Sequence, residues 1–162
     1  MINLIQIRGL LSDEEIEWLV SESNNFETDY FQIYNTQTIN ENSLLDFRKN
    51  IEKYVSINFK ESNYEIRKIW INRVMDTDTK MDLFHQDTSD LTIVTYFRTD
   101  FEGGCFEYYN EDGNKILISP EINLSLVMNN KIIHRITKVT SGKRYSLVSF
   151  FGKIKKDKKT LL

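Results

Sequence analysis

Residues 91–118 read LTIVTYFRTDFEGGCFEYYNEDGNKILI. In this stretch, short runs of β-branched and aromatic residues alternate with the turns Phe101-Glu102-Gly103-Gly104 and Glu111-Asp112-Gly113-Asn114. Such runs between turn residues are typical of strands, and Asp-Gly supplies the positive φ that a tight hairpin connection requires. The stretch therefore predicts consecutive β-strands.

The same texture extends from Tyr64 to Phe151, with a further turn at Thr140-Ser141-Gly142-Lys143. Strands are expected near residues 65–75, 82–87, 91–98, 105–110, 115–118, 124–128, 134–137 and 144–151. Many short strands of this kind favour a sandwich or barrel, and this number suits a jelly roll.

Two helices are expected before the strands. Ser12 and Glu15 form a capping-box pattern, and apolar residues then recur at helical spacing, which predicts a first helix over about 13–23. Ser43 can cap a second helix whose apolar stripe runs from Leu44 to Val55. The segment 24–42 shows no sustained period and is expected to hold a strand with loops. The predicted fold class is therefore mainly β with N-terminal helices.

Length and composition favour one domain in a reducing compartment. The 162 residues suffice for a packed core,. We expect a single domain over 1–162, with helical support in 1–60, a jelly-roll core in 64–152 and a basic tail in 153–162. The single cysteine, Cys105, excludes an internal disulfide framework, and the first residues lack a signal-peptide pattern; both favour a cytoplasmic protein.

The charge balance disfavours nucleic acid and membrane as partners. The formal net charge is −3, whereas indiscriminate nucleic-acid binding needs surplus cations. No apolar stretch approaches the roughly 20 residues that span a bilayer. The one basic cluster, Lys153 to Lys159, is interrupted by Asp157 and has the character of a solvated tail.

The chain has only two histidines, and each lies where a metal ligand would be useful. His85 and Asp87 are two residues apart, so on an extended strand both side chains leave the same face. His134 begins a separate expected strand, which a rolled sheet can bring opposite the first. Two imidazoles and one carboxylate leave open positions on a non-haem Fe(II), although the spacing alone also admits Zn, Cu or Ni.

Arg144 begins an apolar strand, where a buried guanidinium is costly unless an anion pairs with it in bidentate fashion. A dicarboxylic acid fits, because one end could chelate the metal while the far carboxylate pairs with Arg144. Tyr96 could add a hydroxyl donor to that carboxylate, and Ser146 shares the face of Arg144. Lys143 is a lesser candidate because it belongs to the turn and should point away.

In this order, the residues resemble the 2-oxoglutarate- and Fe(II)-dependent dioxygenases, and within them the prolyl 4-hydroxylase-like branch. The resemblance covers about 65–152. Its motifs are His85-Gln86-Asp87, Thr92 to Phe97, Glu102-Gly103-Gly104, Pro120, His134-Arg135, Val139, Gly142 and Arg144-Tyr145-Ser146-Leu147. Each motif is common by itself, but the ordered combination is specific.

The resemblance implies a double-stranded β-helix (jelly roll, cupin-like) core flanked by two or more helices. It implies that His85, Asp87 and His134 hold Fe(II), that Arg144 binds the distal carboxylate of the co-substrate 2-oxoglutarate, and that Tyr96 and Ser146 assist. The implied reaction consumes dioxygen, releases succinate and CO₂ and hydroxylates an unactivated C–H bond, with ascorbate as an additional reductant.

The chain departs from the family pattern at three places. Asn123 stands where glycine is usual after the proline, and Asn tolerates positive φ better than most residues. Met128 replaces a common phenylalanine, a tolerable apolar change. Asn72, Arg73 and Met75 stand where a tyrosine often faces the co-substrate, which leaves its second polar contact open.

The resemblance favours a prolyl or other amino-acid residue in a peptide or protein as substrate. A free amino acid or small metabolite is the next alternative, and a nucleobase ranks third because the acidic balance supplies no phosphate track. From another class, a non-enzymatic jelly roll that stores metal or binds a partner would not turn over 2-oxoglutarate and would tolerate replacement of Arg144. The oligomeric state is left open.

Overall fold

The computed structural model describes residues 4–26, 36–40, 42–77 and 83–155. Its elements are β1 (Ile5–Arg8), α1 (Asp13–Asn24), β2 (Thr36–Thr38), α2 (Leu45–Asn58), β3 (Tyr64–Val74), β4 (Leu91–Thr95), β5 (Glu102–Gly103), β6 (Phe106–Tyr109), β7 (Lys115–Ile118), β8 (Leu124–Asn129), β9 (His134–Ile136), β10 (Val139–Ser141) and β11 (Arg144–Lys153). The predicted class, mainly β with N-terminal helices, is confirmed.

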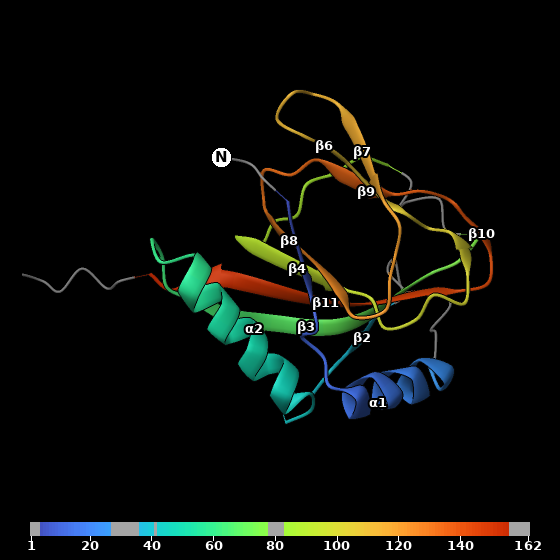
Figure 1. Cartoon of the computed structure of the whole chain (residues 1–162), viewed down its shortest axis with the longest axis horizontal. Coiled ribbons are helices and arrows are strands. Elements are labelled where there is room, and N and C mark those ends of the chain that lie inside the picture. Colours follow the sequence, from blue (N-terminus) through green and yellow to red (C-terminus); the bar gives the residue numbers. More distant parts are fainter. Residues whose placement is uncertain (1–3, 27–35, 41, 78–82, 156–162) are drawn as a thin grey trace, which may run out of the picture.

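Two sheets form the walls of the core. A six-stranded antiparallel sheet has the order β1-β8-β4-β11-β3-β2, and a three-stranded sheet has the order β7-β6-β9, with β5 and β10 paired beside them. Figure 1 shows the two walls facing each other, with α1 and α2 against the outer side of the larger sheet. This is the jelly-roll arrangement that the sequence predicts.

The alternation of side chains along the central strands gives each face of the larger sheet a different task. On β11, Leu147 and Phe151 pack in the core beneath the helices, together with Phe47 and Ile51 of α2. The residues at the alternate positions of β11, including Ser146 and Val148, face the space between the walls. Since successive side chains of a strand point to opposite faces, one strand serves both the core and the cavity.

The start of α1 follows the prediction, whereas the start of α2 does not. The Glu15 N–H donates to Ser12 Oγ at 3.2 Å, and the Ser12 N–H donates to Glu15 Oε1 at 3.1 Å. Ser43 is not the cap of the second helix: the N-cap residue is Leu44, with φ of 58° and no side-chain cap. Instead, the second oxygen of Glu15 accepts from the Phe47 N–H at 3.1 Å. A carboxylate from the neighbouring helix thus replaces a local cap.

The strand predicted over 82–87 is wrong in its described part, residues 83–87. His85 makes a single isolated bridge to His134 and the chain then leaves the pairing. The reason is that β9 is an edge strand of the smaller sheet, and the chain must cross from there to β4 in the larger sheet. Residue 82 lies outside the described residues.

Short pairings add to the predicted strands. β1, β5 and β10 were not expected, and none of them exceeds four residues, too few to show a period. β2 is a strand within 24–42, as predicted, whereas residues 27–35 and 41 lie outside the described residues.

Two predicted backbone conformations are confirmed. Gly113 in the hairpin connection has φ of 76°, and Asn123 has φ of 63°. The Asn123 side chain also binds the backbone of Leu11, accepting from its N–H at 3.0 Å and donating to its carbonyl at 2.9 Å. Asn123 therefore fixes the segment before α1 against the sheet. No helix among the described residues is long and apolar enough to cross a bilayer.

Candidate active site

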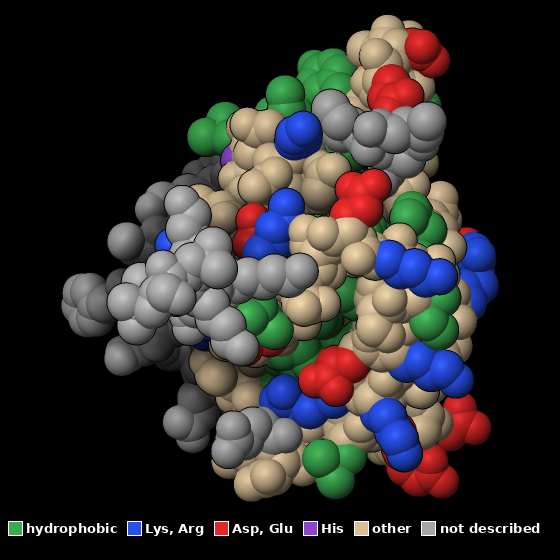
Figure 2. All heavy atoms as spheres, turned by 90° about the vertical axis from the view of Figure 1, so that its left-hand side faces the viewer, with side chains coloured by type: hydrophobic (Ala, Val, Ile, Leu, Met, Phe, Trp, Pro, Cys, Tyr) green, Lys and Arg blue, Asp and Glu red, His purple; other side chains and the backbone are tan. Residues whose placement is uncertain are grey.

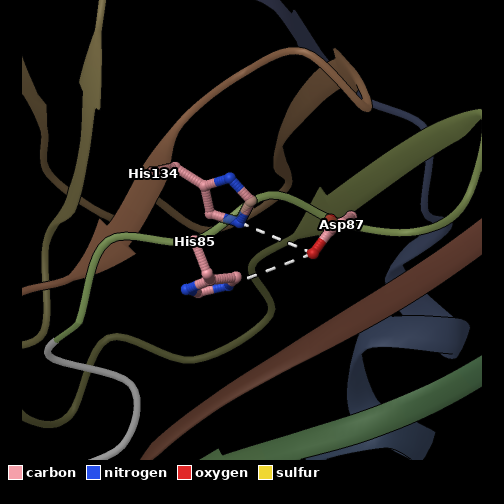
Figure 3. Close-up of side chains that lie close together, drawn as sticks. All are labelled: His85, Asp87 and His134. Atoms are coloured by element: carbon pink, nitrogen blue, oxygen red, sulfur yellow. Dashed lines mark ion pairs between the residues drawn. The ribbon is translucent and has the colours of Figure 1, made fainter.

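One backbone bridge brings the two histidines together. The His85 N–H donates to the His134 carbonyl at 2.9 Å, and the His134 N–H donates to the His85 carbonyl at 3.0 Å. Asp87 then turns its carboxylate toward both rings: Oδ1 lies 3.7 Å from His134 Nε2 and 4.0 Å from His85 Nε2. Figure 3 shows the three side chains converging on one point. The predicted convergence therefore occurs, although not through a regular strand.

Hydrogen bonds to the backbone select the tautomer of both rings. His85 Nδ1 lies 2.9 Å from the Leu83 carbonyl, and His134 Nδ1 lies 3.1 Å from the Ile132 carbonyl. Because a carbonyl only accepts, each Nδ1 carries a proton, so that in the neutral tautomer the lone pair is on Nε2. Two lone pairs and a carboxylate that face one another repel unless a cation lies between them.

The donor set fits a metal ion in chemistry and in scale. Two donors that bind one ion at about 2.1 Å cannot be more than about 4.2 Å apart. Both distances to Asp87 Oδ1 meet this limit, and all three ligand atoms lie within 4.8 Å of one another. The mixture of imidazole and carboxylate suits Fe(II) with positions left open. His85, Asp87 and His134 could therefore hold a metal without a change of fold.

The environment of His134 supports the neutral ring. Phe106 stacks on its imidazole, with ring centroids 5.1 Å apart and an interplanar angle of 15°. Burial lowers the pKa of His134 and outweighs the opposing effect of the Asp87 carboxylate. The lowered pKa favours the uncharged imidazole at neutral pH, with Nε2 free of a proton, which is the state that ligates a metal.

Arg144 is fully buried and held at three points. Its Nε donates to the Gly104 carbonyl at 2.8 Å, Nη1 donates to Ser146 Oγ at 3.3 Å, and Nη2 donates to Tyr96 Oη at 3.1 Å. A Cβ on Gly104 would lie 2.8 Å from Arg144 Cδ, so glycine is required for this packing. Among the described residues, no Asp or Glu forms an ion pair with Arg144.

The residues predicted to assist Arg144 lie next to it. Burial raises the pKa of the Tyr96 hydroxyl against the opposing effect of Arg144, so Tyr96 keeps its proton. Ser146 lines the cavity, whereas Tyr96 is absent from the described residues of its wall. Lys143 is exposed, as expected of a turn residue. The roles of Tyr96 and Ser146 toward a co-substrate stay predictions.

A cavity of about 700 Å³ joins the three-residue cluster to Arg144. Its wall also contains Trp70, Phe106 and Phe150, which the site prediction missed because an aromatic residue at strand spacing has the same signature as core. The alternation of side chains along the strands could have identified them. Phe150 lies on the same face of β11 as Arg144, and Trp70 lies on the same face of β3 as Asn72. Asn72 lines the cavity, whereas Arg73 lies on the opposite face, over the Phe26 ring.

The fold and the converging donors define a class, the jelly-roll proteins with a non-haem metal site. A model of the 2OG-Fe(II) oxygenase superfamily matches residues 70–152, just over half of the chain, and the chain belongs to this superfamily. Its metal is Fe(II) and its co-substrate is 2-oxoglutarate. A comparison with curated protein sequences finds no match.

Solved structures share the fold at low sequence identity. The viral collagen prolyl hydroxylase vCPH from Paramecium Bursaria Chlorella virus-1 is 17% identical, with a TM-score of 0.74 over 94% of this chain and 90% of that chain. A prolyl-4-hydroxylase from Pseudomonas putida is 14% identical, with a TM-score of 0.66 over 96% and 95%. The alpha-ketoglutarate-dependent epimerase SnoN from nogalamycin biosynthesis is 10% identical, with a TM-score of 0.71 over 93% and 76%. At these identities the likeness concerns the fold.

Proposed function

We propose that the protein is a hydroxylase in which His85, Asp87 and His134 hold Fe(II) and Arg144 anchors 2-oxoglutarate. The observation that carries the proposal is the pairing of two features in one cavity. Two Nε2 lone pairs and a carboxylate converge at one place, and a buried guanidinium without a described acidic partner lies at another. A dicarboxylate that bridges a metal and Arg144 satisfies both.

The donors of Arg144 match a carboxylate. A guanidinium has five N–H donors, and the Gly104 carbonyl, Ser146 and Tyr96 occupy three of them. Two donors remain for a bidentate carboxylate, which is the geometry that arginine favours. The three protein acceptors fix the plane of the guanidinium before the ligand arrives, so little conformational entropy is lost on binding.

When bound, Fe(II) supplies activation of dioxygen and oxidative decarboxylation of 2-oxoglutarate to succinate and CO₂, which drives insertion of oxygen into a C–H bond. The chain's own residues position the metal ligands and shield the reacting atoms from water. The backbone carbonyls at Leu83 and Ile132 orient the imidazoles, as hydrogen bonds to the outer ring nitrogen do in metal sites,. Phe106 and Val148 give part of the cavity an apolar wall that limits water near the reacting atoms.

We propose a prolyl or other amino-acid residue of a peptide or protein as the substrate. Two observations support this choice. Solved structures with the same fold are named prolyl hydroxylases. The cavity also has a solvent-facing side at the iron site, where Leu83 is 68% exposed and the His85 side chain is 35% exposed. A peptide residue can therefore reach the metal while the rest of the chain stays outside.

The domain organisation is also a proposal. We infer that the chain is one catalytic domain, because β1 near its start and β11 near residue 153 belong to the same six-stranded sheet. β11 includes Lys153, so the basic segment predicted as a tail begins inside the sheet.

Spectroscopy and turnover test the proposal. Anaerobic addition of Fe(II) and 2-oxoglutarate is expected to give a metal-to-ligand charge-transfer band. In air, proline-containing peptides are expected to gain one oxygen atom by mass spectrometry, with succinate released in equal amount. A non-enzymatic module predicts no succinate, and a metabolite hydroxylase predicts mass gain on free amino acids instead. The same assays with and without ascorbate test the reductant.

A further inference from the structure

A second cationic site borders the cavity on the side away from Arg144. Trp70 and Phe150 form a T-shaped pair, with ring centroids 5.0 Å apart, and their rings line both the cavity and a neighbouring groove. The charged residues of this groove are Arg67, Lys68, Asp90, Lys153 and Lys155. We name it the Arg67–Lys68 groove. Thr88, the residue after Asp87, also lines both spaces.

A β-bulge places two cations at the groove. β11 pairs Phe150 with Lys68 but Phe151 with Ile66, so Arg67 is an extra residue on β3. Bulges re-aim side chains and are frequent next to active sites. The Lys68 side chain lies on the same face of β3 as Trp70. Because of the bulge, the neighbouring Arg67 side chain also lines the groove.

A glycine on the neighbouring strand makes room for the guanidinium. A Cβ on Gly152 would lie 2.6 Å from Arg67 Nε and 3.2 Å from Arg67 Cγ. The Arg67 side chain therefore lies across β11 at Gly152, and a larger residue at position 152 would displace it. Its Glu65 partner is solvent-exposed, and such exposed pairs contribute little, so an incoming carboxylate can compete for the guanidinium.

The groove carries more positive than negative charge. Its lining has one acidic residue, Asp90, and four basic residues, which are Arg67, Lys68, Lys153 and Lys155. Asp90 is engaged, because its Oδ2 accepts from the Lys153 N–H at 2.8 Å. The Lys68 ammonium lies 4.3 Å from the Trp70 ring centroid, which holds it at the border between groove and cavity,.

The groove and Arg144 are too far apart to serve the same small molecule. At about 3.3 Å per residue, the segment of β11 from Arg144 to Gly152 spans about 26 Å. 2-Oxoglutarate at Arg144 therefore leaves the groove open to a different ligand. A ligand that reaches the groove from the iron must pass Trp70 and Phe150, which requires an extended molecule.

We propose that the Arg67–Lys68 groove binds acidic side chains of an extended peptide substrate, one to four residues from the residue that is hydroxylated. This inference rests on the proposed function and specifies its substrate class as an acidic peptide. Trp70 and Phe150 lie between the groove and the iron, where they contact the intervening peptide.

The surface around the groove favours a peptide over a nucleic acid. Figure 2 presents the face toward which β11 ends, and among its described side chains Lys and Arg are interspersed with Asp and Glu. A phosphate backbone needs a continuous cationic track, whereas a few carboxylates need only a local one.

Peptide pairs that differ in charge alone test the proposal. The probes are fluorescein-labelled decapeptides with a central proline, one with two glutamates beside it and one with glutamines in their place. Fluorescence anisotropy on the apo protein is expected to show about tenfold tighter binding of the glutamate peptide, with the difference shrinking as salt screens the exposed charges. Lys68→Glu and Arg67→Glu should each abolish the preference. Lys53→Glu on the exposed face of α2 is the matched control and should retain it.

The outcomes separate this proposal from the proposed function. Equal binding of the two peptides, an equal loss in Lys53→Glu, or equally tight binding of a thymidine oligonucleotide of matched charge would overturn the acidic-peptide assignment. The charge-transfer band with Fe(II) and 2-oxoglutarate involves none of the charged residues of the groove. Its absence would count against the proposed function, while its retention in Lys68→Glu shows that the variant is folded and its cavity intact.

Discussion

The two faces of the six-stranded sheet use the same strands for different purposes. The outer face is mainly apolar, and on it Leu147 and Ile71 pack against Phe47 and Ile51 of α2. The small buried hydroxyls of Thr95, Ser125 and Ser149 are interspersed among these residues. The inner face, on the same strands, carries the buried Arg144 with its three acceptors. The contrast indicates that stability depends chiefly on the outer face, which leaves the inner face able to hold polar groups that burial alone would disfavour.

Asp87→Ala should cause the largest loss of activity, because it removes a proposed metal ligand near the inner face. Loss of the shared carboxylate is expected to reduce succinate release by about 10⁴-fold, or about 5 kcal/mol of transition-state stabilisation, and to remove the charge-transfer band. The free energy of unfolding of the apo protein in urea should change little, because the Asp87 carboxylate gains no attraction from the two imidazole lone pairs that it faces. Asp112→Ala, in the hairpin turn, is the matched control and should leave turnover unchanged. Turnover retained by Asp87→Ala would refute the assignment of the metal ligands.

Phe47→Ala should lower stability and leave binding of 2-oxoglutarate unchanged. The Phe47 side chain is 0% exposed in the core beneath the helices, and its truncation is expected to lower the free energy of unfolding by about 3–5 kcal/mol. At a temperature where the variant remains folded, KM for 2-oxoglutarate should match that of the wild type. A rise of KM beyond about threefold, more than about 0.6 kcal/mol, would show that the two faces are coupled.

Arg144→Lys sharpens the comparison within the inner face. An ammonium cannot keep the contacts to the Gly104 carbonyl, Ser146 and Tyr96 and also bind a carboxylate in bidentate fashion. KM for 2-oxoglutarate is expected to rise by about 100-fold, or about 2.7 kcal/mol. Calorimetric titration with Fe(II) alone should be unaffected. Lys143→Ala, one residue earlier in the exposed turn, should behave as wild type; if it does not, the anchor has been misassigned.

Asn123→Ala is expected to have the smallest effect, on the joint between the helices and the sheet. Alanine loses both hydrogen bonds to Leu11 and disfavours the positive φ, which should cost about 1–2 kcal/mol of unfolding free energy,. Asn123→Gly restores the backbone freedom but not the bonds, so its stability should fall between the two. Thermal denaturation of the three proteins measures this order, and an alanine variant as stable as wild type contradicts it.

Local sequence patterns predicted most of the fold. The capping box at Ser12, the strand over Lys115–Ile118 and the positive φ at Asn123 each depend on a few neighbouring residues, and the structure has all three. The start of α2 was mispredicted because its cap comes from Glu15, far away along the chain. The strand over 83–87 was mispredicted because pairing depends on where β9 lies, which no local pattern contains.

The candidate site divides in the same way. The candidates His85, Asp87, His134 and Arg144 were predicted because those residue types, in that order, are chemically distinctive. The structure brings the first three together, and the roles of all four stay predictions. The Gly104 carbonyl that holds Arg144 and the stacking of Phe106 on His134 were not readable, since each depends on a contact between distant segments.

The sequence by itself predicted the candidate residues His85, Asp87, His134 and Arg144 and most of the strands, because side-chain chemistry and alternation are local properties. Only the tertiary structure decided that one bridge aligns the two histidines and that a bulge at Arg67 places cations beside the cavity. These features depend on register between strands that the sequence separates, and register is fixed only when the sheets pack.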